Sequence, residues 1–183
     1  MKRLLQSAIV LLFVVLLTSC TLSPAAAVRR EPLLPASDGE PVNFEIRQSV
    51  HWRDGVLVYY TFDTDQLDPP GVTHECGYSA YVQRGLLDWH TTSGGGICRA
   101  SSEVTDSFQR TGDSGVGDTG TGAYGMVTDP AAVEVRVTWS DGLTDTVALV
   151  NESYLVIHAG QTSVERVEAL DAAGTVIAAY SLQ

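Results

Sequence analysis

The clearest strand signal in this chain is Val133-Glu134-Val135-Arg136-Val137-Thr138-Trp139. Apolar and polar side chains alternate along it, and a period of two residues is typical of a strand with one buried face. Turn sequences follow at Asp141-Gly142 and from Asp171 to Gly174, each between further runs of apolar residues. Residues 130–183 are therefore predicted to form an antiparallel meander.

A similar pattern occupies residues 42–100. Asp54-Gly55 separates two runs rich in Val, Tyr and Phe, over Phe44–Val50 and Val56–Phe62. Asp-Gly in that setting predicts a β-hairpin. A second strand pair is expected on either side of Arg84-Gly85, so this part of the chain is predicted to be a hairpin region.

Residues 101–129 lie between these two regions and are rich in glycine and aspartate, without any apolar period. They are predicted to form a mobile Gly/Asp-rich loop. The expected fold is all-β, an antiparallel β-sandwich or two packed small β-sheets over residues 42–183, with no substantial helix after the signal peptide. One shared core is favoured because each half alone is near the lower size limit for a stable domain.

The N-terminus has the pattern of a secretory signal peptide. Lys2 and Arg3 precede an apolar run from Leu4 to Leu17, which is shorter than the roughly 20 apolar residues that span a bilayer. The run ends in Leu17-Thr18-Ser19-Cys20. Residues 1–19 are therefore predicted to be a signal peptide, although a secreted protein with Cys20 in a discarded signal, or a stop-transfer anchor, would share some of these features.

This four-residue motif resembles the lipobox of bacterial lipoproteins. The resemblance implies that Cys20 carries a diacylglyceryl group, that the chain is cut before it, and that acyl chains such as palmitate hold the protein on the extracytoplasmic face of the cell membrane. Whether that is the inner or the outer membrane is left open. Residues 20–41, with four prolines and an alanine run, are expected to be an extended tether.

The charge of the chain is strongly negative, −11 for the full sequence. Without residues 1–19, nine arginines face 22 acidic residues, a net charge near −13. Nucleic acids and anionic lipid surfaces attract basic patches, so no nucleic-acid partner is expected. The expected partner is the membrane, through the lipid anchor; a protein or glycan ligand is not identified, and no cofactor is indicated.

Two cysteines remain after Cys20, and an even pair in an oxidising compartment predicts a disulfide between Cys76 and Cys98. An alternative gives Cys98 a catalytic role. Ser93 to Arg99 partly resembles the nucleophile motif of L,D-transpeptidases, cell-wall enzymes that use a cysteine. The resemblance would make Cys98 the nucleophile, with His90 or His74 as the base that a thiolate needs.

A third hypothesis concerns calcium. Asp106, Asp113, Asp118 and Asp129 recur through the glycine-rich segment, and Ca²⁺ takes six to eight oxygen ligands from such side chains. Their spacing matches no EF-hand, so they are weak candidates, and no metal site is predicted. The function expected from the sequence is a lipid-anchored binding or structural module of the cell envelope without catalysis. A cysteine enzyme and a calcium-dependent adhesion or sensor domain are the alternatives.

Overall fold

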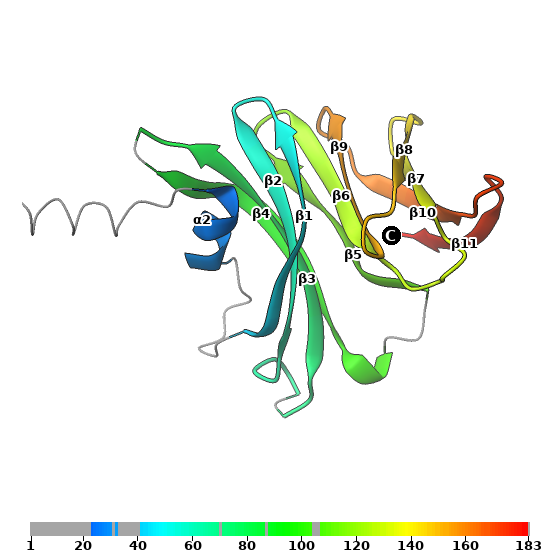
Figure 1. Ribbon diagram of the computed structural model, residues 1–183, viewed down its shortest axis with the longest axis horizontal. Coiled ribbons are helices and arrows are strands. Elements are labelled where there is room, and N and C mark those ends of the chain that lie inside the picture. The colour runs from blue at the N-terminus through cyan, green and yellow to red at the C-terminus, as the bar shows by residue number, and fades with distance from the viewer. Residues whose placement is uncertain are drawn as a thin grey trace, which may run out of the picture.

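The computed structural model describes residues 23–30, 32, 41–69, 71–86, 88–103 and 107–182. Within these ranges the chain folds into three antiparallel sheets stacked face to face, with a short helix on the outside of the stack (Figure 1). The all-β prediction is confirmed. The stack has one sheet more than the two expected, because the segment predicted as a loop supplies most of the middle sheet.

The first sheet, sheet A, is a meander of four consecutive strands in the order β1-β2-β3-β4. Its strands are β1 (Val42–Trp52), β2 (Gly55–Thr64), β3 (His74–Arg84) and β4 (Trp89–Ala100). Asp54-Gly55 forms the β1–β2 hairpin as predicted. Tyr59 and Tyr60 point to opposite faces of β2, yet both are fully buried, because apolar clusters cover both faces of the sheet.

The middle sheet, sheet B, has the order β5-β6-β9. Its strands are β5 (Phe108–Val116), β6 (Gly120–Val127) and β9 (Ser153–Ala159), and a 3₁₀ turn, η1 (Ser101–Glu103), follows β4. Every residue of β6 is buried, since sheet A covers one face and sheet C the other. The prediction of a mobile loop over residues 101–129 is therefore wrong for the two strands it contains.

Close packing explains why strand β6 contains glycines and has no apolar pattern in its sequence. A Cβ atom on Gly122 would lie 2.4 Å from the Leu57 side chain, and one on Gly125 would lie 2.8 Å from the Tyr154 ring. Glycine at these positions lets large side chains of neighbouring strands fill the space. The apolar side chains that cover these positions therefore belong to other strands, and the sequence of β6 itself shows no apolar period.

The third sheet, sheet C, has the order β11-β10-β7-β8. Its strands are β7 (Glu134–Trp139), β8 (Thr144–Ala148), β10 (Val164–Leu170) and β11 (Val176–Ser181). Trp139 is fully buried in the cluster that joins sheets B and C. The meander predicted for residues 130–183 is interrupted by β9, which leaves the region and pairs with β6.

The helix α2 (Pro24–Arg30) lies within the segment predicted as an extended tether. Ser23 caps it by accepting a hydrogen bond from the Ala26 N–H through its Oγ, at 3.1 Å, and a proline in the first helical turn costs no hydrogen bond. Val28 is fully buried and Ala27 nearly so, in the apolar cluster on the outer face of sheet A. Residues 24–30 are thus docked on the domain, which corrects that part of the tether prediction.

None of the helices in the described ranges is long and apolar enough to cross a membrane.

Candidate functional site

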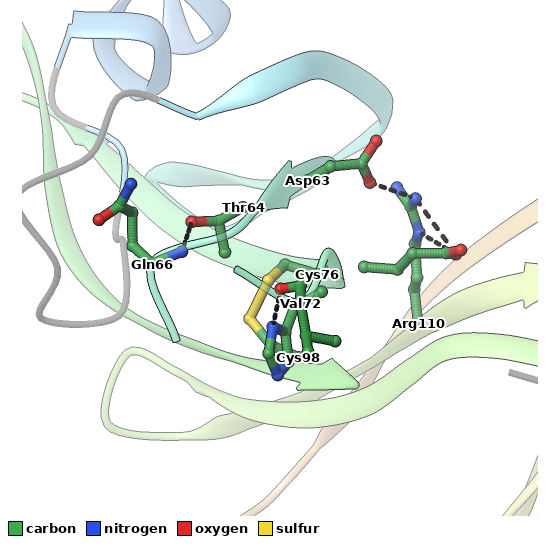
Figure 2. Close-up of a disulfide and its surroundings, with 9 residues drawn as sticks. Asp63, Thr64, Gln66, Val72, Cys76, Cys98 and Arg110 are labelled. Atoms are coloured by element: carbon green, nitrogen blue, oxygen red, sulfur yellow. Dashed lines mark hydrogen bonds and ion pairs between the residues drawn. A yellow bond between two sulfur atoms is a disulfide. The ribbon is translucent and has the colours of Figure 1, made fainter. Parts of the chain in front are cut away.

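Cys76 and Cys98 form the predicted disulfide, which joins directly opposite residues of β3 and β4 (Figure 2). The bridge belongs to the apolar outer face of sheet A, the face on which α2 packs. A bridged sulfur is no thiolate, so the residue named in the transpeptidase hypothesis is occupied here in a structural bond. Cys20 lies outside the described residues.

The two histidines named as possible bases lie at opposite ends of the β3–β4 pair. His74 is buried, and its Nδ1–H donates to the Val72 carbonyl at 2.8 Å. His90 is exposed near the opposite end of β4, eight residues and about 26 Å of strand from Cys98. Cys98, His74 and His90 therefore do not form a nucleophile with an oriented base.

The candidate calcium ligands are likewise dispersed. Asp113 accepts the Val164 N–H through its Oδ2 at 3.2 Å and so joins β5 to β10. Asp118 lies in the β5–β6 turn, Asp129 caps the turn after β6 by accepting the Ala131 N–H, and Asp106 is outside the described residues. In the described part of the chain no three acidic, histidine or cysteine side chains gather into a group that would hold a metal ion.

A polar pocket of about 240 Å³ opens at one end of the A–B sandwich. Three segments distant in sequence meet there: the β1–β2 turn, the end of β3, and the β5–β6 turn. The residues that line it are Trp52, Arg53, Asp54, Tyr81, Gln83, Val116, Gly117, Asp118 and Thr119. Its volume lies below the range of about 300–1,000 Å³ typical of drug-sized ligands, so it suits one small molecule or one ring of a longer one.

Asp54 is the centre of the polar network in this pocket. Its carboxylate accepts hydrogen bonds from the Tyr81 hydroxyl and from the Gln83 amide, both at 3.1 Å, while Tyr81 also donates to the Trp52 carbonyl at 2.9 Å. The bond from Gln83, with help from the backbone and Tyr81, lowers the pKa of Asp54 below its usual value. The pocket thus presents a carboxylate that stays ionised at neutral pH.

Trp52 and Arg53 line another side of the pocket. The Arg53 guanidinium lies over the Trp52 ring, 5.7 Å from its centroid, and Arg53 has a left-handed backbone with φ of 51°. The buried Nε1 of Trp52 has no hydrogen-bond partner among the described residues. It lies close to buried Gly120 of β6, where a Cβ atom would be 3.2 Å from it, so this N–H points into the packed interior and not into the pocket.

The β5–β6 turn is braced from two sides. The Ser93 hydroxyl of β4 donates to the Gly115 carbonyl and accepts the Gly117 N–H, both at 3.3 Å, and the Gln161 amide donates to the Asp118 carbonyl at 3.2 Å. Gly117 has a φ of 57°, and a side chain there would press against the Tyr81 ring. The pocket wall is therefore fixed before any ligand arrives, which lowers the entropic cost of binding.

A second polar cluster joins sheets B and C. The His158 ring of β9 contacts Asp145 Oδ2 through Nδ1 and Asp141 Oδ2 through Nε2, both at 3.0 Å. The Trp139 indole stacks on the same ring at 4.9 Å and donates to Asp145 at 2.7 Å. Desolvation lowers the pKa of His158, but the two carboxylates outweigh it, and the net shift is upward.

Of the residues that line this pocket, only Asp118 is a candidate ligand in the sequence analysis, as a weak calcium candidate. Asp54 was interpreted only as a turn residue, and the segments that surround it are separated by up to about 65 residues in the chain. The strand signals on both sides of Trp52-Arg53-Asp54 located the hairpin, but a single sequence does not show that the β5–β6 turn faces it.

No family model matches this chain, and no similar protein was found among curated proteins or solved structures.

Proposed function

We propose that this protein is a lipid-anchored, extracytoplasmic module of the bacterial cell envelope that binds a small polar ligand without catalysis. The lipobox-like Leu17-Thr18-Ser19-Cys20 supports the anchor and the compartment. The disulfide is consistent with an oxidising compartment.

The pocket around Asp54 is the observation that carries the binding function. It combines an ionised carboxylate, an amide and a guanidinium beside an aromatic ring on a braced framework. Hydroxyl groups donate to carboxylates and accept from guanidinium and amide N–H groups. A polyhydroxylated ligand, such as one sugar ring of an envelope glycan, matches this set of donors and acceptors.

Two measurements test the proposal. For the anchor, cells fed radiolabelled palmitate are compared between the wild-type chain and Cys20→Ser; label in the wild type and none in the variant is the expected result. Equal labelling of both, or of neither, would contradict the anchor at Cys20.

For the ligand, the purified protein is titrated with glucose, N-acetylglucosamine and their β-1,4-linked dimers, and chemical shifts are followed by NMR. Shifts centred on Trp52 and Gln83 are expected. The affinity should fall at least about tenfold in Asp54→Asn, which keeps the size of the side chain but removes its charge. Glu165→Gln, an exposed carboxylate of sheet C, is the matched control. No shift at the pocket with any of these sugars would remove the glycan assignment.

A further inference from the structure

We infer that the mature protein lies directly against the membrane, with the tip of the β3–β4 hairpin in contact with the bilayer beside the lipid anchor. This inference rests on the lipidation of Cys20 in the proposed function. It replaces the expectation of a long tether that holds the domain away from the membrane.

The length of chain between the anchor and the folded domain is the first argument. Ser23, which caps α2, is only three residues after Cys20. Three extended residues reach about 11 Å at most. Because Val28 of α2 is fully buried against sheet A, the start of this helix belongs to the domain, and a lipid on Cys20 would keep that end within about 11 Å of the bilayer.

The second argument is the position of the helix. Helix α2 contacts β3 and β4, and Trp89, the first residue of β4, packs against the same apolar cluster as Ala27 and Val28. In Figure 1 the β3–β4 hairpin projects from the sandwich on the side where α2 lies. The anchor and the hairpin therefore share one side of sheet A.

The hairpin tip has an unusual composition, and this is the third argument. Positions 85–88, between the two strands, have the sequence Gly-Leu-Leu-Asp. Segments between paired strands normally carry Gly, Pro, Asn, Asp or Ser, whereas two of these four residues are leucines. Leu86 is 97% exposed, against 39–58% for the other exposed large apolar side chains of the described residues. A single exposed leucine is ordinary, but one at the tip of a projecting hairpin beside an anchor can enter the interfacial region of a bilayer.

Charge on this side of the molecule favours shallow contact with phosphates. Exposed arginines stand at Arg84, next to the hairpin tip, and at Arg29 and Arg30 in the last turn of α2. These are three of the nine arginines in a mature chain that is otherwise strongly acidic. Asp88 is also exposed at the tip, so we expect Leu86 to lie at the level of the headgroups and not deep in the acyl chains.

A fluorescence experiment tests the contact on the full-length lipidated protein. Leu86→Cys is labelled with the environment-sensitive fluorophore NBD and reconstituted into vesicles of phosphatidylethanolamine and phosphatidylglycerol, with or without brominated acyl chains. Leu143→Cys is the matched control, because Leu143 is an exposed leucine (58%) in the β7–β8 turn of the far sheet. The expected result is a blue-shifted emission and bromine quenching at position 86, with neither at position 143.

Intact mass and flotation distinguish a failure of the membrane contact from a failure of the lipid anchor. Intact mass and flotation with the vesicles report whether the chain is acylated and anchored. An anchored chain whose labels at 86 and 143 behave alike would overturn the membrane contact and leave the anchor standing. A chain that is neither acylated nor floated would overturn the lipid anchor, and the inference with it. Since Leu86 contacts little else, its replacement should not disturb folding, and unchanged near-ultraviolet circular dichroism verifies this.

Discussion

Sheet B is joined to each of its neighbours by one cation held between two carboxylates. On the side of sheet A, Arg110 of β5 contacts Asp63 at 2.8 Å and Glu75 at 3.3 Å (Figure 2). On the side of sheet C, His158 of β9 contacts Asp141 and Asp145, both at 3.0 Å. The arrangement is the same on both sides, but the chemistry of the cation differs.

That difference determines how each junction responds to pH. A guanidinium is charged at every pH that a protein meets, whereas an imidazole is charged only below its pKa. The A–B junction should therefore keep its bridge into the alkaline range, and the B–C junction should lose part of its own. Three substitutions test this contrast.

Removal of the disulfide is expected to have the largest effect and to leave the contrast unchanged. Cys76→Ala/Cys98→Ala opens a crosslink between residues separated by 22 positions, and chain entropy gives about 3 kcal/mol for a loop of that length. Urea unfolding measures this loss in the free energy of unfolding. Both polar bridges remain in the variant, so the dependence of stability on pH should keep its shape; a changed shape would mean that the bridges depend on the crosslink.

Arg110→Met should rank second. It leaves Asp63 and Glu75 without their cation, and breaking a fully buried pair costs roughly 3–5 kcal/mol. These carboxylates are 20% and 24% exposed, so solvent screening reduces the expected loss to about 2 kcal/mol. The triple variant Arg110→Met/Asp63→Asn/Glu75→Gln removes the unpaired charges and should recover part of the stability in the same urea assay. No recovery would show that Arg110 acts mainly through its left-handed backbone (φ of 51°) or its packing.

His158→Gln is expected to have the smallest effect, about 1 kcal/mol at low pH, because the two carboxylates that face the imidazolium are 42% and 39% exposed and solvent screens the pairs. The pKa of His158 is raised in the folded protein above the value of about 6.5 that it has in an unfolded chain. Its contribution is therefore complete below about pH 6.5 and is lost as the pH rises through the folded pKa.

The measurement is the free energy of unfolding of both proteins from pH 5 to 9. The wild type should lose stability relative to His158→Gln as the pH increases, until the two curves run parallel. A constant difference across this range would mean that His158 has the same pKa in the folded and the unfolded protein, and that the B–C junction does not differ from the A–B junction in this respect.

Local signals in the sequence were sufficient for much of the fold. The alternation that ends at Trp139 is strand β7, Asp54-Gly55 is a hairpin, and the disulfide between Cys76 and Cys98 was predicted from the count of cysteines and an expected oxidising compartment. The strand and the hairpin depend on residues that are close in sequence, and two cysteines allow only one pairing.

The predictions that were wrong share a physical cause: each concerns a segment whose structure depends on residues distant in the sequence. Gly122 and Gly125 of β6 leave room for side chains from other strands, so no apolar period marks the strand. Helix α2 has only Ala27 and Val28 to bury, and its stability comes from the sheet on which it packs. The pocket around Asp54 depends in the same way on the β5–β6 turn, which a sequence read as a loop could not place.

The order of strands in sheets A and B has a consequence for how the chain folds. Sheet A consists of four strands that follow one another in sequence, whereas sheet B receives its last strand, β9, only after the β7–β8 hairpin of sheet C. Contacts between nearby segments form faster than distant ones, so sheet A should assemble first. Until β9 arrives, β6 would expose an open backbone edge, and such edges recruit strands from other molecules. During synthesis from the N-terminus, the edge of β6 would stay open until β9 has been made. The β5–β6 hairpin is therefore the segment that a chaperone would need to protect from aggregation.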